Sequence, residues 1–493
     1  MPELLCYTTK VWLSEPSLEM PFGLSLSGDA MNDTLISIAR SWGETSHCRF
    51  DTAEILQWVK QRNETVEVDI HKTRLEDCGN WFYDRQEGCI RNENRSFFTI
   101  TGLQKLQDGT PVLSQPVIMQ PEIGYLGIIC QEIDGVMHFL MQAKIEPGNV
   151  NKIQLSPTIQ ATKSNFTQKH GGNRPAYLDY FINASQYEIV VDQVQSEQSS
   201  RFYKKRNRNI LIRVEEEITI LDSHRWMTLG QIKQLMREDN LVNMDTRTVL
   251  SCIPYSQMDL TEEIRQELSG CFTDRALFRS VFEGVKENLM PPVFQYLNNY
   301  KMFNEETLVF PPLHKLEGWT EKDGELVCKT PYPFKLVFCD IAIEGREVRH
   351  WTQPLFEATG IATFGLILTE IDGITRFLVH AAPEVGCFDG IELGPTVQRE
   401  AVTLSQQEDG ITRFFLERLE NGHGVIFDHL LSEEGGRFYH EQNRNVLMQV
   451  DYSELPDLPS DYFLLDYRTL NRLVQVNNTM NIQLRNLLSL LEA

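Results

Sequence analysis

The sequence predicts an α+β fold made of two tandem lobes of mixed β-sheet with packed helices, related by internal duplication. The segment EIDGVMHFLMQAKIEPG (132–148) returns as EIDGITRFLVHAAPEVG (370–386), at a spacing of 238 residues. Further along, RFYKKRNRNILIRV (201–214) returns as RFYHEQNRNVLMQV (437–450), two residues out of step. Matches of this length in the same order indicate that one ancestral unit was copied.

Each copy contains the same succession of local signals. Apolar β-type runs flank an Asp-Gly pair, at Asp134-Gly135 and again at Asp372-Gly373, and such a pair is a strong hairpin signal. A helical pattern follows late in each copy, at 228–239 and at 466–491. Because sheet and helix must each cover an apolar face, we expect helices packed on a mixed sheet in each lobe.

These signals divide the chain into four parts. Residues 1–75 are predicted to form an N-terminal helical segment, in which DTAEILQWVKQRNE is a helix candidate. Residues 76–250 form the first lobe, 251–303 a helical connection and 304–493 the second lobe. No low-complexity linker separates the lobes, so we expect them to pack together.

The composition excludes several classes of partner. With 41% hydrophobic and 23% charged residues, the 493-residue chain has the composition of a globular protein. Its formal net charge of −23 argues against nucleic acid or an anionic membrane as the main partner. No apolar run approaches the roughly 20 residues that cross a bilayer. The ten cysteines are scattered without a C-x-x-C pair, and no secretory signal is visible, which favours a cytoplasmic location.

Several longer segments carry a likeness to a known family. The segments QAKIEPGN (142–149), QLSPTIQATKSNFTQKHGG (154–172), YLDYF (177–181), GREVRHWTQPL (345–355) and ELGPTVQ (392–398) closely resemble the NDP-hexose 2,3-dehydratases. The resemblance covers nearly the whole chain. It implies a homodimer in which each subunit has two Nudix-hydrolase-like lobes. It also implies a substrate such as dTDP-4-keto-6-deoxy-glucose and a place in deoxysugar biosynthesis.

Neither a metal nor a redox cofactor is expected. Nudix hydrolases hold Mg²⁺ with a carboxylate-rich helix of pattern G-x5-E-x7-R-E-x-x-E-E-x-G, and neither lobe contains it. A G-x-G-x-x-G unit between a strand and a helix is also absent. The implied elimination requires no redox cofactor, so we expect catalysis by side chains alone.

The implied reaction defines what the site must supply. The 4-keto group makes the C3 hydrogen acidic, so a base removes it, donors stabilise the enolate at the C4 oxygen, and an acid protonates the departing C2 hydroxyl. Each candidate for these roles also has a structural interpretation, as a surface histidine, a turn carboxylate or a packed aromatic ring with a polar tip. The candidate catalytic residues are His170, Glu146, Tyr203, Glu384 and Tyr439.

Polar residues that recur in both lobes, or that gather in one of them, are the candidates for substrate binding. The basic run RFYKKRNRN suits a diphosphate, although charged residues also protect solvated strand edges. Repeated glutamines suit sugar hydroxyls, and Trp351 suits either stacking on thymine or a place in the core. The predicted binding residues are Gln115, Lys144, Gln160, Ser164, Asn165, Arg201, Arg206, Asn207, Arg208, Arg349, Trp351, Gln353, Gln398, Arg437, Asn443 and Arg444.

The sequence leaves open which lobe is catalytic. The second lobe has Trp351 where the first has Leu113, whereas the first has Lys144 where the second has Ala382. Two alternatives to a dehydratase also remain. One is a catalytically inactive nucleotide-sugar-binding or scaffold protein. The other is a nucleoside diphosphate hydrolase, which the missing metal-binding helix disfavours.

Overall fold

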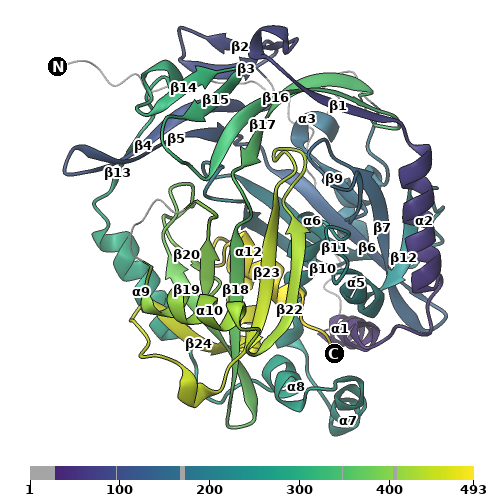
Figure 1. Cartoon of the computed structure of the whole chain (residues 1–493). Helices are drawn as coiled ribbons and strands as arrows, with labels where there is room; N and C mark the ends of the chain where they lie inside the picture. The colour runs from purple at the N-terminus through teal and green to yellow at the C-terminus, as the bar shows by residue number, and fades with distance from the viewer. Residues whose placement is uncertain (1–27, 96, 167–172, 347, 403–407) are drawn as a thin grey trace.

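The computed structural model describes residues 28–95, 97–166, 173–346, 348–402 and 408–493 (Figure 1). It is a mixed α+β protein, as predicted, and the described residues form four β-sheets. Residues 28–251 are here called the first half and residues 275–489 the second half, because the elements of the first recur in the second in the same order.

Each half contains a seven-stranded sheet of the same topology. In the first half the order is β10-β11-β6-β7-β12, with β8 on β7 and β9 on β6, and the one parallel pair in it is β11 with β6. The strands are β6 (Gly124–Ile133), β7 (Val136–Ile145), β8 (Ile153–Ser156), β9 (Ile159–Ala161), β10 (Glu188–Ser196), β11 (Arg206–Arg213) and β12 (His224–Thr228).

The second half repeats this sheet with equivalent neighbours, and β18 and β23 form its parallel pair. Its strands are β18 (Thr363–Ile371), β19 (Ile374–Ala382), β20 (Glu392–Gly394), β21 (Val397–Arg399), β22 (Val425–Ser432), β23 (Gln442–Gln449) and β24 (Tyr462–Asp466). The internal duplication read from the sequence is therefore also a duplication of sheet topology.

The two predicted hairpins are confirmed. Strands β6 and β7 pair up to the turn, and its central residues Asp134 and Gly135 have φ angles of 51° and 80°. Asp372 and Gly373 have φ angles of 54° and 70° between β18 and β19. Positive φ at both central positions defines the hairpin turn that matches the right-handed twist of the strands, and Asp-Gly adopts it with little strain.

Each half also contributes to two five-stranded sheets, and here the halves exchange a strand. Strand β1, which precedes the first of these sheets in the chain, pairs with β16 of the second half, Val68 opposite Ile343. Strand β13 from the second half pairs with β4 of the first half, Thr307 opposite Leu106. Figure 1 shows β1 beside β16 and β13 beside β4. The exchange locks the two halves together.

The five-stranded sheets have the orders β13-β4-β3-β2 with β5 on β4, and β1-β16-β15-β14 with β17 on β16. Their strands are β1 (Val68–Thr73), β2 (Trp81–Asp84), β3 (Cys89–Asn92), β4 (Thr99–Gln107), β5 (Thr110–Met119), β13 (Thr307–Val309), β14 (Trp319–Lys322), β15 (Glu325–Cys328), β16 (Phe334–Ile343) and β17 (His350–Ala358). The predicted helical segment 1–75 thus also contains a strand of the second half's sheet.

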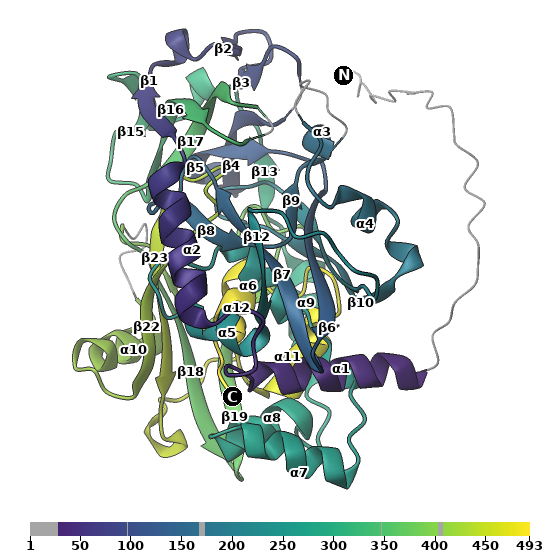
Figure 2. The same cartoon turned by 90° about the vertical axis from the view of Figure 1, so that its right-hand side faces the viewer.

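Helices cover the outer faces of the sheets. Helix α2 (Thr52–Thr65) begins at a capping box in which Asp51 and Glu54 satisfy each other's backbone N–H groups. It lies with α1 against the first half (Figure 2). Apart from two buried helices described below, the other described helices of four or more residues are α1 (Gly28–Trp42), α3 (Lys163–Phe166), α4 (Leu178–Ile182), α5 (Leu229–Leu235), α7 (Glu262–Cys271), α8 (Arg275–Phe282), α9 (Met290–Phe303), α10 (Gly410–Glu420) and α11 (Tyr467–Val474). None of the described helices is long and apolar enough to cross a membrane.

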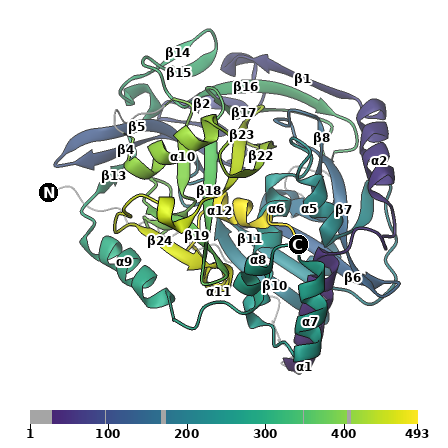
Figure 3. The same cartoon turned by 60° about the horizontal axis from the view of Figure 1, so that its bottom comes forward.

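Two buried helices pack against each other between the seven-stranded sheets, α6 (Met244–Ser251) and α12 (Ile482–Ser489) (Figure 3). Their arginines reach across to the opposite half. Arg247 Nη2 donates to the carbonyl oxygen of Ser432 at 2.7 Å, and Arg485 Nη2 donates to that of Ser196 at 2.6 Å. These bonds fix the start of the two loops that carry the repeated Arg-Phe-Tyr sequence.

The turn after β7 in one half lies directly on the Arg-Phe-Tyr loop of the other half. The amide of Gly148 donates to the carbonyl oxygen of Gly435 at 2.7 Å, and His440 donates back to Gly148 at 2.8 Å. The turn after β19 repeats this contact through Gly386, which donates to Ser199 at 2.9 Å. A Cβ atom at Gly148 would overlap the carbonyl oxygen of Phe438, so glycine is required by the close approach of two backbones.

This contact gives a stability prediction. Gly148→Ala places its methyl group on a backbone atom that cannot rotate away, so we expect the free energy of unfolding to fall by about 2–4 kcal/mol. The measurement is urea unfolding at neutral pH. Gly410→Ala is the matched control, because no atom lies within 4 Å of a Cβ there, and it should change stability little or raise it. Equal effects of the two changes would contradict the proposed clash.

Candidate active site

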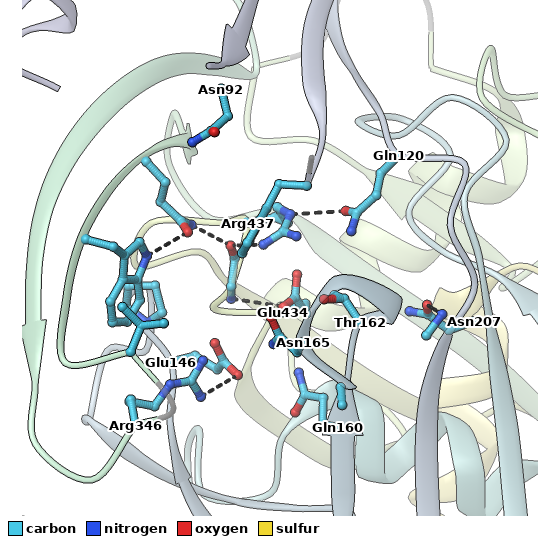
Figure 4. Close-up of a pocket in the computed structure, with 18 of the residues that line it drawn as sticks. Asn92, Gln120, Glu146, Gln160, Thr162, Asn165, Asn207, Arg346, Glu434 and Arg437 are labelled. Atoms are coloured by element: carbon cyan, nitrogen blue, oxygen red, sulfur yellow. Dashed lines mark hydrogen bonds and ion pairs between the residues drawn. The ribbon is translucent and has the colours of Figure 1, made fainter. Parts of the chain in front are cut away.

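A cavity of about 440 Å³ lies where the seven-stranded sheet of the first half meets loops of the second half (Figure 4). Both halves supply polar side chains to its wall. The first half contributes Gln120, Lys144, Glu146, Gln160, Thr162, Asn165, Glu197, Lys205, Asn207 and Asp245. The second half contributes Arg346, Trp351, Gln353, Glu434 and Arg437. The cavity therefore depends on the contact between the halves.

One side of the cavity is a buried ion network at the end of β7. Lys144 Nζ lies 2.8 Å from Glu146 Oε1, and Arg346 Nη1 lies 3.3 Å from the same oxygen. Lys144 also donates to the carbonyl oxygen of Gln160 at 2.9 Å. Burial alone raises the pKa of Glu146, but Arg346 and Lys144 outweigh it and lower the pKa to about 2. Glu146 is therefore ionised at neutral pH.

Two further carboxyl groups in the wall of the cavity behave in the reverse way. Burial raises the pKa of Glu197 to about 7, although Lys205 opposes the shift. Glu197 Oε1 accepts a hydrogen bond from Asn207 Nδ2 at 2.7 Å. Burial also raises the pKa of Glu434, against the attraction of Arg437. Carboxyl groups with raised pKa values can hold or release a proton near neutral pH, which is what acid–base catalysis requires.

The loop that carries Glu434 and Arg437 is held by backbone and amide contacts. Glu434 Oε1 accepts from the amide of Gly436 at 3.0 Å, while Gln353 Nε2 donates to the carbonyl oxygen of Gly436 at 2.7 Å. Trp351 Nε1 in turn donates to Gln353 at 2.9 Å, and Arg437 Nε donates to Gln120 Oε1 at 3.2 Å. Figure 4 shows these bonds as one chain along the cavity wall. The loop is thus placed before any ligand binds.

The positively charged side chains of the cavity already have acceptors. Lys205 Nζ donates to the carbonyl oxygens of Glu122 and Arg206 and to Asn207 Oδ1. Burial lowers its pKa to about 8, although Glu197 opposes the shift. Together with Lys144, Arg346 and Arg437 it gives the cavity four basic groups inside an acidic protein, which suits a ligand of negative charge.

The arginine at the equivalent place has different charged neighbours. Arg201, the counterpart of Arg437, is 3% exposed and lies 3.2 Å from Glu400 and 3.8 Å from Glu441. Its guanidinium stacks on Phe334 at 4.2 Å, as that of Arg437 stacks on Phe98 at 4.4 Å. The two halves thus use one arginine in the same position but surround it with different charges.

Eight of the predicted residues lie in the wall of the cavity, and they are brought together from both halves. Ser164 lies just behind the wall, where its amide donates to Glu122 at 3.1 Å. His170 falls outside the described residues. The eight are Glu146, Lys144, Gln160, Asn165, Asn207, Trp351, Gln353 and Arg437.

The remaining predicted residues are not brought into this cavity. Arg208 and Arg444 pair with Asp192 and Asp428 on the outer strands of their sheets, each at 2.6 Å. The tyrosines and Arg206 pack on aromatic rings, and Arg349 pairs with Glu67 at the surface. Gln115 bonds to Ser200 within the first half, and the remaining residues form hydrogen bonds within the second half. These residues, with Arg201 described above, are Tyr203, Tyr439, Glu384, Gln115, Arg206, Arg349, Gln398 and Asn443.

Sequence reasoning missed several residues of the cavity, above all Glu197, Glu434 and Asp245. Extending the Arg-Phe-Tyr alignment four residues upstream, from EQSS to EEGG, would have found Glu197 opposite Glu433. Glu434 aligns with Gln198 and Asp245 with Gln483, so neither carboxyl group is repeated at the equivalent position of the other half. No group of three His, Cys, Asp or Glu residues suited to a metal occurs in the described part of the chain, and the expected absence of a metal stays a prediction.

The two turn carboxylates, Glu146 and Glu384, give a prediction with opposite signs. Glu146 has a folded pKa of about 2 against an ordinary 4.5, so it contributes stability above pH 4.5 that is lost as the pH falls toward 2. Burial raises the pKa of Glu384 to about 7, so the protein loses stability as the pH rises from 4.5 toward 7.

We therefore expect Glu146→Gln to lower the free energy of unfolding at pH 7 by on the order of 2–3 kcal/mol and to flatten its dependence on pH below 4.5. Glu384→Gln should instead remove the loss between pH 5 and pH 8. Urea unfolding measured from the acid range below pH 4.5 up to pH 8 tests both. Parallel pH profiles for the two variants would refute the assignment.

Comparison with known proteins gives the family. The family model of the NDP-hexose 2,3-dehydratases matches residues 52–253 and again residues 290–491, which are the two copies found in the sequence and in the fold. Three relatives carry the name dTDP-4-dehydro-6-deoxy-alpha-D-glucopyranose 2,3-dehydratase. The relative from Saccharopolyspora spinosa is 36% identical over 90% of this chain and 91% of its own length.

The relative from Streptomyces violaceoruber is 37% identical, covering 89% of this chain and 96% of its own. That from Amycolatopsis orientalis is 32% identical, covering 92% and 93%. Similarity of this extent, with both copies matched, supports dehydration of an NDP-hexose in deoxysugar biosynthesis over a binding protein without activity. The chain belongs to the NDP-hexose 2,3-dehydratase family and is a sugar-nucleotide dehydratase, a carbon–oxygen lyase.

Proposed function

We propose that the enzyme removes water across C2 and C3 of dTDP-4-keto-6-deoxy-glucose, and that the cavity of the first half is its active site. The observation that carries the proposal is the pairing of buried carboxyl groups of raised pKa with four basic residues in one cavity. The names of the three relatives support the nucleotide and the sugar. The pairing of Arg201 with Glu400 and Glu441, where the cavity has Thr162 and Lys205, supports catalysis in the first half.

The elimination proceeds by transfer of two protons. A base takes the proton from C3, and the electrons form the enolate with the C4 oxygen. The C2–oxygen bond then breaks, and an acid supplies the proton with which the hydroxyl leaves as water. The resulting C2–C3 enol takes a proton at C2 and becomes a 3,4-diketo-2,6-dideoxy sugar. The step needs no electron acceptor, because the oxidation at C3 is balanced by the reduction at C2.

Glu434 and Glu197 are the proposed base and acid. Glu434 accepts a backbone hydrogen bond and faces Arg437, and both features favour its ionised form relative to an isolated buried carboxyl. Glu197, with a pKa of about 7, holds its proton on a substantial fraction of molecules at neutral pH. A pair of carboxyl groups in different surroundings can thus divide the two proton transfers.

The basic residues and the indole are the proposed nucleotide site. The Arg346 guanidinium lies 5.8 Å from the centre of the Trp351 ring at the cavity wall. A thymine ring stacks well on indole, and arginines bind phosphate oxygens with two parallel N–H groups. Arg346, Arg437 and Lys144 therefore face the part of the substrate that carries the negative charge.

Three finer assignments follow from the family resemblance and are also proposed. The seven-stranded mixed sheet with its single parallel pair supports a Nudix-like fold for each half. A homodimer and a cytoplasmic location rest on the resemblance and on the scattered cysteines. Sedimentation equilibrium tests the homodimer, since a concentration-independent mass near 57.0 kDa would overturn it.

The reaction is tested by incubating the purified protein with dTDP-4-keto-6-deoxy-glucose in D₂O without added metal, followed by mass spectrometry and NMR. We expect loss of one water molecule and deuterium at C2 of the product, because the enol takes its proton from solvent. Binding without loss of water would support the inactive binding protein. Release of dTMP would identify a hydrolase, and either result would overturn the proposal.

The acid–base assignment is tested by Glu434→Gln and Glu197→Gln. Each change removes a proton carrier but keeps the shape, so we expect kcat to fall by about 10²–10⁴ while the Kd for dTDP changes little. Glu433→Gln is the matched control, since this buried carboxyl is the counterpart of Glu197 in the second half, and it should retain most of the activity. A loss of equal size in the control would argue for a structural effect.

A further inference from the structure

One carboxyl group of the cavity has no role in the proton transfers described above. Asp245 lines the cavity, is 1% exposed, and neither of its oxygens has a hydrogen-bond partner among the described residues. Burying a polar group without a partner costs free energy that folding does not recover. Such a group in a cavity wall is therefore a strong candidate to contact a ligand.

The position of Asp245 is rigid. It is the second residue of α6, whose N-cap Asn243 accepts from the amide of Thr246 at 2.9 Å. The helix is buried against α12, and Arg247 anchors it to the second half through Ser432. A carboxyl group on such a helix keeps its place in the cavity without the ordering cost that a flexible loop would bring.

The surroundings of Asp245 favour its neutral form. Burial raises its pKa well above the ordinary value, Glu197, Glu434 and Glu146 raise it further, and Lys144 opposes them. The N-terminus of α6 favours the anion by a smaller amount. The group therefore keeps its proton to a higher pH than an ordinary aspartic acid does, and a protonated carboxyl group can donate a hydrogen bond.

The duplicated position supports a neutral side chain at this place. Gln483 stands where the second half repeats Asp245, is 4% exposed, and its Oε1 atom also has no partner among the described residues. An amide cannot ionise, so the helix and its packing tolerate a neutral polar group here. The fold thus requires no charge at position 245.

The enolate needs a donor at the C4 oxygen, and the basic residues are largely committed to other acceptors. Lys205 donates to three oxygens, and Lys144 donates to Glu146 and Gln160. Arg437 donates to Gln120 and Gly436. A neutral carboxyl group in a low-dielectric site is an effective donor to a developing oxyanion.

We propose that Asp245 contacts the substrate as a neutral carboxylic acid that donates a hydrogen bond to the C4 oxygen of the sugar while the enolate forms. The proposal rests on the proposed function. The proton stays on Asp245 throughout, the C3 proton goes to Glu434, and Glu197 protonates the departing hydroxyl. Asp245 thereby stabilises the negative charge without taking part in either proton transfer.

Two substitutions at this position separate a donor from a base. Asp245→Asn keeps the shape and supplies an N–H donor, so we expect kcat for dehydration within about tenfold of the wild type. Asp245→Leu keeps the volume but has no donor, so we expect kcat to fall by about 10²–10³, as for loss of one oxyanion donor. The Kd for dTDP, which lacks the sugar, should stay within about threefold in both variants.

Each other outcome counts against the proposal. Strong loss in both variants would mean that Asp245 acts as an ionised base, and near-normal kcat in both would mean that it does not contact the reacting sugar. Gln483→Leu is the matched control on the equivalent helix and should retain activity and the thermal unfolding midpoint. If Asp245→Leu does not fold, Asp245→Ala takes its place as the variant without a donor. A loss of about 10²–10³ in kcat for Asp245→Ala beside a retained kcat for Asp245→Asn supports the donor, and equal kcat in the two variants refutes it.

The test also separates this proposal from the proposed function. Wild-type protein that converts dTDP-4-keto-6-deoxy-glucose establishes the reaction whatever the variants do. Wild-type protein that binds dTDP but leaves the sugar unchanged would remove the proposed function and the role of Asp245 with it. The proposed role of Asp245 alone is rejected only if the wild type converts the sugar and the kcat values of the variants differ from the expected pattern.

Discussion

The structure depends on the close approach of two backbones, the turn after β7 in one half and the Arg-Phe-Tyr loop of the other. Gly148 and Gly386 have no room for a side chain at this contact. Because the approach is so close, Glu146 at the start of one turn comes within reach of Glu434 and Arg437 on the loop above it. The strand exchange of β1 and β13 holds the same interface from the outside. A cavity lined by both halves is the direct consequence.

The two halves share one sheet topology, but two exchanges of charge distinguish the surroundings of their equivalent arginines. In the second half, Glu400 and Glu441 hold the Arg201 guanidinium in the space between them. The equivalent positions of the first half are Thr162 and Lys205, so a neutral and a positively charged side chain replace these two carboxylates. Arg437 bonds instead to Gln120. The charges around the equivalent arginines therefore differ, although the sheet topology is the same in both halves.

Local signals in the sequence predicted the duplication and both hairpins, because Asp-Gly turns and repeated motifs act over a few residues. They did not predict the strand exchange, since nothing in VDIHKT (68–73) encodes which edge it pairs with. The predicted helix 466–491 is two helices. Asn478 has a φ of 58°, and Met480 forms a bridge with Leu393, so tertiary pairing overrides the helical pattern between them.

The residues of the candidate site were likewise predictable from the sequence only in part. The basic run after Arg201 was predicted as one phosphate site, yet side chains alternate along a strand. Asn207 on β11 reaches Glu197 in the cavity, whereas Arg208 next to it points to Asp192 on the other face. The alternation of side chains along a strand, which places Asn207 and Arg208 on opposite faces, can be read from the sequence. By contrast, Glu434 and Asp245 have no repeated partner of the same type, and only their place in three dimensions reveals them.

In the proposed mechanism, substrate binding is coupled to protonation of the buried carboxyl groups of the cavity. Before binding, the four basic groups and the ionised Glu146 leave the cavity positive, while Glu197, Glu434 and Asp245 resist ionisation because they are buried close together. A bound diphosphate adds negative charge and further favours the protonated carboxyl groups. In the proposed mechanism, substrate binding therefore favours the protonated forms of the acid and of the neutral donor. Among the three groups, Glu434 has both a backbone N–H and an adjacent guanidinium to favour its ionised form, which is why it is the one proposed as the base.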